Sequence, residues 1–344
     1  MPHTSPLAHL IPADSDPLPG YRAAKESAAL FDVSATGKIL VTGPEGPKFL
    51  HNLCTNDLEN LPLGGGCEAY FCDHKAKALF QVRVYHVLVN GEQHALWMDT
   101  TPGYNEKLLQ HLDRYLISEQ AELADRTAEF VQLHVAGPGA ADVLGRCIGE
   151  TLPELGEFLH MERSIGDAVV SIRRFDPLGV PGYDLVCLNA AAEGLWRTLE
   201  AGGAKPASPE AFELLRVEAG TPVYGVDIDD NRFVMEVAHA ARAVSYEKGC
   251  FLGQEPIVMS RDRAGHVNRA FLGVKLSERT AGAGAKVWRD GKEVGLVTSS
   301  VESPKLSTAL ALAYIRRGNQ EPGTAVEVED EQGKQPAEVI ALPV

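Results

Sequence analysis

One local pattern occurs twice in this sequence and restricts how the chain can fold. Each copy has a short apolar strand, a Gly-Pro pair that ends it, and a following segment in which apolar residues recur with helical spacing. The copies comprise residues 38–41, Gly43-Pro44 and residues 45–54, and then residues 131–135, Gly137-Pro138 and the segment around Val143 and Leu144. A period of about 94 residues is too long for a solenoid. The repeat therefore predicts two related halves of one α+β unit.

The segment between the two copies has the alternation of antiparallel strands. Between residues 67 and 99 apolar and polar residues alternate, and Asp73-His74-Lys75 and Asn90-Gly91 are turn sequences. We predict a three-stranded meander here, followed by a helix within residues 101–117 that has Pro102 in its first turn. Further strands are predicted at residues 169–174 and 183–188, and further helices at residues 191–201 and 209–219.

The residue pattern changes after Val267. Short strands separated by paired glycines and by Asp290-Gly291 fill the rest of the chain, which is typical of a small antiparallel β-domain. We therefore expect an α+β region over residues 1–269 and a β-domain over residues 270–344. The first 17 residues are rich in proline and are predicted to form a loose arm.

Charge and cysteine spacing limit the class of protein. The 344 residues carry a net charge of −15, which repels phosphate backbones, so direct nucleic-acid binding is not expected. The six cysteines show no CxxC spacing, and no metal site or redox pair is predicted. The scattered thiols fit a reducing compartment. Since neither a signal peptide nor a long apolar run is present, we expect a cytoplasmic protein that does not enter the membrane.

The loop EKGCFLGQEP, residues 247–256, places a thiol among glycines. Lys248 lies two residues before Cys250, and a neighbouring cation lowers the pKa of a thiol. Gly249 and Gly253 permit positive φ and a close approach of a ligand to the main chain. A reactive thiol is one interpretation, but spacing alone slightly favours a buried cysteine in a tight turn.

Two further segments carry charged residues with the chemistry to bind a ligand. Arg216 and Glu218 could bind a carboxylate and an amide edge, although taken alone a capped helix with exposed charges is the better interpretation. A local positive cluster follows the Cys250 loop and fits carboxylates or polyanions, and we slightly favour a ligand role over a solvated loop. Its members are Arg261, Arg263, His266 and Arg269.

Several common catalytic signatures are missing from the sequence. It has no phosphate-binding GxxxxGK[ST] loop, no GxGxxG after a strand, no HExxH and no GxSxG. Asp176 and the acidic run at residues 227–230 lack EF-hand spacing, so a turn-rich surface is favoured there over a cation site. These absences disfavour nucleotide-triphosphate, dinucleotide, zinc-protease and serine-hydrolase functions.

The motif KGCFLGQE, from Lys248 to Glu255, resembles the K-G-C-[FY]-x-G-Q-E signature of the YgfZ family. These proteins are folate-binding relatives of the glycine-cleavage T-protein, an aminomethyltransferase of the GcvT superfamily. Segments such as LLRVEAGTPVYGVDI and RAGHVNRAFLGV resemble the same superfamily, so the resemblance extends from about residue 28 to the end. It implies an α+β fold shaped as a three-lobed ring. Two α+β lobes interleave in sequence, and a C-terminal β-barrel closes the ring around a folate-sized hole.

The resemblance also implies site residues. Cys250 would be the reactive thiol near the folate, with Lys248 as its catalytic partner. Tetrahydrofolate or a one-carbon derivative is the implied cofactor, and no metal is implied. The implied folate-binding residues are Arg216, Glu218, Tyr224, Gly253, Gln254, Glu255 and Arg269.

The sequence departs from T-proteins at three functional positions. T-proteins carry an acidic pair where this chain has Phe80-Gln81, and one of those acids lies near the reactive folate nitrogen. Phe80-Gln81 supplies neither a carboxylate nor a general base. A Gly-Glu-Asp-Gly run is replaced at residues 179–182, and an Arg-Asp pair is replaced by Phe212-Glu213. These departures argue against the T-protein reaction.

Three functional hypotheses follow, and whether the chain is an enzyme stays open. We favour a tetrahydrofolate-binding accessory protein for iron–sulfur cluster assembly or repair, which serves enzymes that include those of tRNA modification. Its partners would be folate and iron–sulfur enzymes or assembly proteins. The alternative is an aminomethyltransferase or related one-carbon transferase that uses tetrahydrofolate and an aminomethylated lipoyl carrier protein. The third is a folate-binding scaffold in which Cys250 is only structural.

Overall fold

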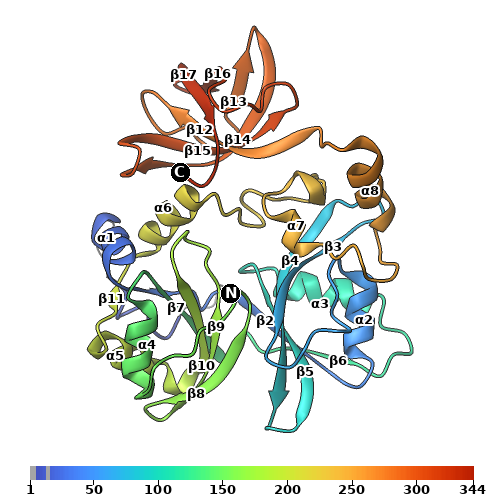
Figure 1. Ribbon diagram of the computed structural model, residues 1–344, viewed down its shortest axis with the longest axis vertical. Coiled ribbons are helices and arrows are strands. Elements are labelled where there is room, and N and C mark those ends of the chain that lie inside the picture. Colours follow the sequence, from blue (N-terminus) through green and yellow to red (C-terminus); the bar gives the residue numbers. More distant parts are fainter. Residues whose placement is uncertain (1–4, 13–15) are drawn as a thin grey trace.

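The computed structural model describes residues 5–12 and 16–344, which form three lobes (Figure 1). The first lobe has a five-stranded sheet with the order β3-β4-β5-β2-β6. Its elements are β2 (Gly37–Thr42), α2 (Gly46–Leu53), β3 (Gly66–Cys72), β4 (Ala78–Val89), β5 (Gln93–Thr100), α3 (Asn105–Asp113) and β6 (Glu122–Asp125). Ile39, Leu50 and Leu108 pack in the core between this sheet and its helices.

The second lobe has a six-stranded sheet with the order β11-β1-β7-β10-β9-β8. Its strands are β1 (Ala29–Asp32), β7 (Phe130–Ala136), β8 (His160–Ile165), β9 (Ala168–Arg174), β10 (Gly182–Leu188) and β11 (Lys205–Pro206). Its helices are α1 (Leu18–Glu26), α4 (Ala140–Ile148), η1 (Asn189–Ala191), α5 (Ala192–Ala201) and α6 (Pro209–Ala219). Leu133, Ile172 and Trp196 lie in the core that joins the sheet to α4 and α5.

The third lobe is a closed barrel with the strand order β12-β15-β14-β13-β16-β17. Its strands are β12 (Arg269–Leu276), β13 (Lys286–Arg289), β14 (Lys292–Ser303), β15 (Thr308–Arg316), β16 (Ala325–Asp330) and β17 (Gly333–Ile340). Short helices connect it to the first two lobes: η2 (Val234–Glu236), α7 (Ala240–Ala243), α8 (Gln254–Met259) and η3 (Ser260–Ala264). Closure removes the exposed strand edges that a small open sheet would leave.

The two α+β lobes interleave in sequence. Strand β1 precedes β2 in the chain, yet it pairs with β7 in the second sheet, while β2 to β6 build the first. The expected fold class, two interleaved α+β lobes with a C-terminal antiparallel barrel, is therefore confirmed.

The repeated Gly-Pro pairs have a common physical cause. Gly43 has φ +97° and Gly137 has φ +135°, a region that side chains with a Cβ avoid. A Cβ at Gly43 would lie 2.3 Å from the carbonyl oxygen of Gln120, and one at Gly137 would lie 2.4 Å from that of Ser27. Each glycine therefore allows a strand to turn into a helix directly against another segment of backbone.

Two local predictions need correction, and one strand of the second lobe has no counterpart among the predictions. Pro102 does not lie in the first turn of the predicted helix, because α3 begins at Asn105. The loose N-terminal arm is wrong at Leu7, which is buried in the core of the second lobe, while residues 1–4 and 13–15 lie outside the described residues. The strand β8 was not predicted, because its sequence HMERSI is too polar to show a strand pattern.

Candidate functional site

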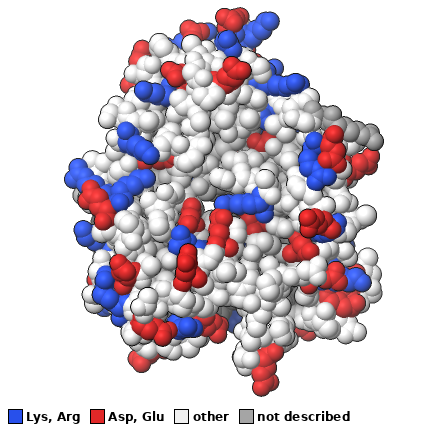
Figure 2. Space-filling model, viewed as in Figure 1, with Lys and Arg blue, Asp and Glu red and all other residues white. Residues whose placement is uncertain are grey.

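A cavity of about 380 Å³ lies where the two sheets, helix α6 and the segment after that helix meet. In the space-filling view, the face of the molecule is hollowed near its centre and charged side chains surround the hollow (Figure 2). Phe31, Phe175, Phe212 and Tyr224 contribute aromatic wall to the cavity. Its size is in the range of sites for small organic ligands.

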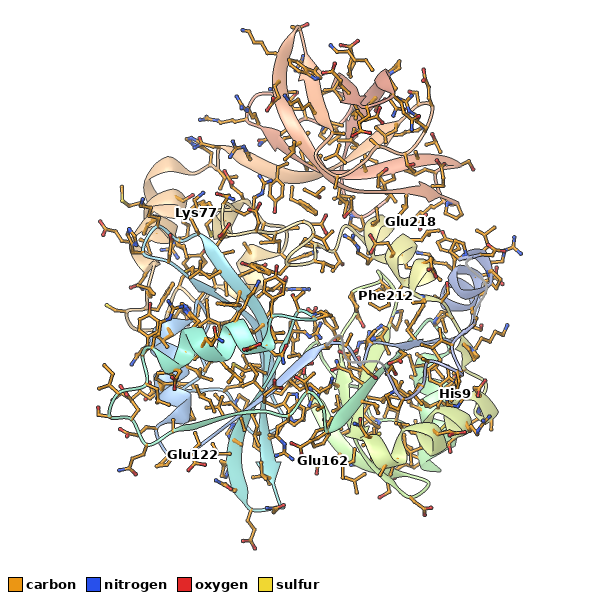
Figure 3. All side chains as sticks on the ribbon, turned by 180° about the vertical axis from the view of Figure 1, so that it is seen from behind. His9, Lys77, Glu122, Glu162, Phe212 and Glu218 are labelled. Carbon is orange, nitrogen blue, oxygen red and sulfur yellow. The ribbon has the colours of Figure 1, made fainter. Side chains whose placement is uncertain are left out.

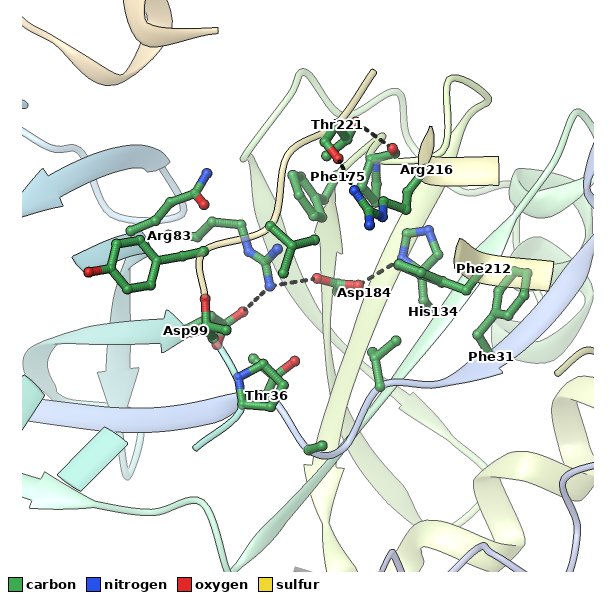
Figure 4. A pocket seen from close by; sticks show the side chains of 18 of the residues that line it. Phe31, Thr36, Arg83, Asp99, His134, Phe175, Asp184, Phe212, Arg216 and Thr221 are labelled. Carbon is green, nitrogen blue, oxygen red and sulfur yellow. Dashed lines mark hydrogen bonds and ion pairs between the residues drawn. The ribbon is translucent and has the colours of Figure 1, made fainter. Parts of the chain in front are cut away.

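One end of the cavity is formed by an arginine between two buried aspartates (Figure 4). Arg83 Nη2, on β4, lies 3.4 Å from Asp99 Oδ2 and 3.6 Å from Asp184 Oδ2. The guanidinium also lies 4.1 Å from the ring centre of Phe175. Burial lowers the pKa of Arg83, but the charges of Asp184 and Asp99 raise it more, so the net shift is upward. We call Arg83, Asp99 and Asp184 the charged floor.

The aspartates of the charged floor have a dense set of donors. Asp99 accepts from Trp97 Nε1 at 2.8 Å, from Arg173 Nη1 at 3.1 Å and from Gln132 Nε2 at 3.3 Å. Asp184 accepts from Gln132 Nε2 at 3.0 Å, and its Oδ1 lies 2.7 Å from His134 Nδ1. Burial raises the pKa of Asp184, but the His134 hydrogen bond and the nearby arginines lower it more. The floor is thus fixed in place as a charged surface.

A second polar group lies along β3 and β4 at the cavity wall. Gln81 Nε2 donates to Glu68 Oε1, and Arg242 Nε donates to Glu68 Oε2 at 2.6 Å. Arg242 also donates through Nη1 to Glu157 at 2.7 Å. Glu68, Gln81 and Arg242 all line the cavity. A carboxylate therefore stands beside Gln81, one strand away from the position where the sequence lacks an acid.

Two of the predicted folate residues, Arg216 and Tyr224, line the cavity. Arg216 is buried and donates to Asp227 at 2.6 Å, to Ser299 at 2.7 Å and to Glu213 at 2.8 Å. Asp227 is itself buried, so the turn-rich surface expected for its segment is wrong at that residue. Arg216 thus links α6 to the barrel through Ser299, and the Arg216 side chain also lines the cavity.

Glu218 lies elsewhere, although it is on the same helix as Arg216. It accepts hydrogen bonds from Tyr21 Oη at 2.9 Å, from Ser303 Oγ at 2.6 Å and from the Lys305 amide at 3.2 Å. Figure 3 shows it at the end of α6 beside the barrel, whereas Phe212 on the same helix lies nearer the middle of the molecule. Its role in this structure is to join α1, α6 and the barrel.

The hydrogen-bond partners of the Lys248 side chain are main-chain carbonyl oxygens of the first lobe. The ammonium is buried and donates to the carbonyl oxygens of His51, of Cys54 at 2.8 Å and of Asn56 at 2.9 Å. These carbonyls lie at the C-terminal end of α2, where helical carbonyls lack intrahelical partners. Lys248 therefore caps a helix.

The second half of the motif loop packs against β3 of the first lobe, where Phe251 lies in a buried cluster with Cys72. Gly253 has φ +83°, and a Cβ there would lie 2.6 Å from Cys72 Sγ, so the loop requires glycine at this position. Gln254 and Glu255 begin α8, and Cys250 is exposed. Among the described residues that line the cavity, none comes from residues 248–255. The structure therefore separates the motif cysteine from the cavity.

The described members of the predicted positive cluster are not among the residues that line the cavity. Arg261 pairs with its neighbour Asp262, and Arg269 is the first residue of the barrel strand β12, opposite Arg316. The side chain of Arg263 lies outside the described part of the structure. Whether any residue of the cluster meets a ligand stays a prediction.

Sequence patterns alone do not identify five of the polar and charged residues that line the cavity or contact its floor. Each of these residues has apolar neighbours in its strand. They are Glu68, Arg83, Asp99, His134 and Asp184. Charged residues are seldom buried unless paired, so their presence inside apolar strands was the available signal.

Two structural absences hold for the described residues. No group of three or more His, Cys, Asp and Glu side chains among them has the arrangement of a metal site. None of the described helices combines the length and the apolar composition needed to cross a membrane.

Comparison with known sequences identifies relatives over nearly the whole chain. A protein named aminomethyltransferase from Rippkaea orientalis is 30% identical over 316 residues, 90% of this chain and 84% of the relative. One from Saccharopolyspora erythraea is 28% identical over 333 residues, 94% of this chain and 88% of the relative. These relatives overturn our preferred hypothesis of an iron–sulfur accessory protein, because their shared name is that of the alternative. They support neither iron–sulfur partners nor a role in tRNA modification.

A solved structure with the same fold is the glycine cleavage system aminomethyltransferase T from Bartonella henselae. It superposes with a TM-score of 0.84 at 23% identity, over 100% of this chain and 91% of that one. Residues 269–344 match the glycine cleavage T-protein C-terminal barrel domain, and residues 19–248 match the GCVT N-terminal domain. Because these matches cover most of the chain, the protein belongs to the GcvT superfamily.

Proposed function

We propose that this chain is a folate-dependent aminomethyltransferase. The observation that carries the proposal is the cavity between the lobes, which combines aromatic walls with a fixed charged floor. The name shared by the relatives supports the same reaction class. Phe80-Gln81 lacks an acid, which from sequence argues against an aminomethyltransferase. That argument is weakened because other carboxylates line the same cavity.

The residues of the cavity fit the chemistry of tetrahydrofolate. The pyrimidine half of its pterin is planar, and the outer edge of that half carries N–H donors next to a carbonyl oxygen. Asp184 supplies an acceptor and Arg83 a donor from adjacent positions on the floor. Phe175 and Tyr224 supply apolar contact beside this edge. These four residues would hold the pterin, with Arg216 in the surrounding wall.

The second substrate would be an aminomethyl group carried on the lipoyl arm of a carrier protein. Folate accepts the one-carbon unit, and the products are methylenetetrahydrofolate, ammonia and the reduced carrier. The contribution of the protein is to position the reactants and to manage protons in a site lined by the two α+β lobes and the segment that follows α6. All six cysteines are unpaired, which supports a reducing compartment such as the cytoplasm.

The remaining predicted site residues have no part in this proposal. Glu218 and Lys248 have structural partners, and Gly253, Gln254, Glu255 and Arg269 lie outside the cavity lining. A role of Cys250 toward folate stays a prediction that the proposed reaction does not need.

The proposal is tested by mixing the purified protein with tetrahydrofolate and an aminomethylated carrier protein and measuring methylenetetrahydrofolate and ammonia. We expect equal amounts of the two products, with turnover on the order of 1 s⁻¹ or faster. The Asp184→Asn protein, which loses a charge of the floor, should bind tetrahydrofolate at least tenfold more weakly. Binding of folate without any turnover would support the scaffold hypothesis and contradict a transferase.

A further inference from the structure

The cavity contains several carboxylates, and they differ in how fully they are hydrogen-bonded. Asp99 accepts three hydrogen bonds and Asp184 has one partner on each oxygen, and both lie beside Arg83 as its counter-charges. Asp32, at the end of β1, accepts from the Ser34 amide. Glu213 forms a bidentate pair with Arg216, and its side chain is 48% exposed. Glu68 has one donor on each oxygen, and its side chain is only 5% exposed. An ionised carboxylate offers about four acceptor positions, so Glu68 keeps acceptor capacity inside the cavity.

The strand register explains why Glu68 faces the cavity. Glu68 on β3 lies opposite Arg83 on β4, and Tyr70 lies opposite Gln81. Because side chains alternate along a strand, Gln81 and Arg83 point to one face of the sheet, and Glu68 points to that face with them. All three line the cavity. Glu68 is thus placed between the charged floor and the wall near α7.

Glu68 and Gln81 divide two tasks between them. A side-chain amide cannot act as a general base at neutral pH, whereas a carboxylate held within a cavity can. Gln81 donates its amide hydrogen to Glu68 Oε1, and Arg242 donates to Oε2, so the carboxylate is held from both sides. The charged and titratable groups that interact electrostatically with Glu68 include Arg83 from β4, Arg242 from α7, His239 beside α7, and Tyr70 and Cys67 from β3.

We propose that Glu68 is the proton acceptor of the cavity and that Gln81 positions it. The inference rests on the proposed aminomethyl transfer. In that reaction two folate N–H bonds and the carbon–sulfur and carbon–nitrogen bonds of the aminomethyl group break, and two new carbon–nitrogen bonds form. One released proton ends on the carrier sulfur and the other on the departing ammonia. Glu68 takes each proton at a carboxylate oxygen and gives it up again, so it leaves the cycle unchanged.

A set of three variants tests this assignment. Glu68→Gln keeps the shape of the side chain but removes its base, and we expect kcat to fall about 100-fold. The dissociation constant for tetrahydrofolate should stay within about threefold, because the floor is intact. Glu157→Gln is the matched control, since it removes the other carboxylate partner of Arg242 at a half-exposed position. It should keep kcat within about twofold.

The third variant exchanges the two groups. In Glu68→Gln/Gln81→Glu the carboxylate moves to the adjacent strand of the same face, and kcat should recover to within about tenfold of the wild type. A kcat of Glu68→Gln within threefold of the wild type would overturn the proposal. So would an equal loss in Glu157→Gln, or no recovery in the exchanged protein, because either result would assign the loss to Arg242 or to packing.

The outcomes separate this inference from the proposed function. If the wild type and Glu68→Gln turn over equally well, the role of Glu68 is rejected and the proposed transferase activity stands. If the wild type shows no turnover at any carrier concentration, the proposed transferase activity is rejected, and the role of Glu68 is rejected with it.

Discussion

The ammonium of Lys248 donates a 2.8 Å hydrogen bond to the carbonyl oxygen of Cys54, at the end of helix α2. This contact joins the motif loop to the first lobe, although the two residues are 194 positions apart in the sequence. Burial lowers the pKa of Lys248, which shows the cost of placing a charge here. The three carbonyl acceptors offset that cost.

Lys248→Met should therefore destabilise the fold. Three buried carbonyl oxygens would lose their donor, and we expect the free energy of unfolding to fall by about 2–4 kcal/mol. Urea denaturation followed by circular dichroism measures the change. Lys75→Met removes a lysine from an exposed turn and should change the value by less than about 0.5 kcal/mol. Equal stability of the Lys248→Met and Lys75→Met proteins would contradict the capping role.

Cys250 should be the first cysteine to react with an alkylating agent. Burial raises the pKa of Cys54 and Cys187 to about 11 and that of Cys72 to about 12, and Cys250 alone among the six is exposed. Iodoacetamide at pH 7.5, followed by peptide mass spectrometry, should label Cys250 at least tenfold faster than any of these three. Cys250→Ser should lose the fast phase and keep its folate affinity, because the thiol lies outside the cavity. Fast labelling at a different cysteine would contradict this prediction.

The Arg216–Asp227 pair should hold the barrel against α6. Asp227 also accepts from Ser299 Oγ at 2.7 Å and from the Val223 amide at 3.0 Å, and both members of the pair are buried. Asp227→Asn leaves the guanidinium without its buried counter-charge, so we expect a loss of about 3 kcal/mol in unfolding free energy. Glu213→Gln removes the exposed partner of the same arginine and should cost less than about 1 kcal/mol. Equal losses in the two variants would count against the pair.

His160 should make the fold sensitive to mild acid. Burial and the charges of Arg173 and His86 lower its pKa to about 4, against about 6.5 in the unfolded chain. Since the folded state favours the neutral ring, this contribution to stability is complete above pH 6.5 and is lost as the pH falls toward 4. Between pH 7.5 and pH 5 the wild type should lose about 2 kcal/mol more than His160→Gln.

Urea titrations of both proteins at the two pH values give this difference. The other histidines are present in both proteins, so their contributions cancel in the comparison. The same loss in wild type and variant would show that His160 is not the cause.

Local sequence signals were sufficient for elements with clear boundaries. Helix α6 has the predicted bounds Pro209–Ala219, with Ser208 accepting from the Ala211 amide at its start and Gly220 in the left-handed conformation at its end. The Gly-Pro pairs were equally informative, because their geometry allows few other residues. Strand β8 carries no such signal and depends on its neighbour β9.

The site could not be assembled from local signals. Arg83, Asp99 and Asp184 come from three strands in two sheets, and only the interleaved topology brings them together. The motif around Cys250 is distinctive in sequence, yet its lysine caps helix α2 and its second glycine allows close packing against Cys72. A distinctive motif and a ligand site are therefore separate features in this chain.

A structure determined with bound tetrahydrofolate tests the central claim most directly. The claim predicts the pterin in the cavity between Phe175 and Tyr224, with its polar edge on the floor formed by Arg83, Asp99 and Asp184. Folate bound beside Cys250 with the cavity empty, or no bound folate at saturating concentration, would contradict it.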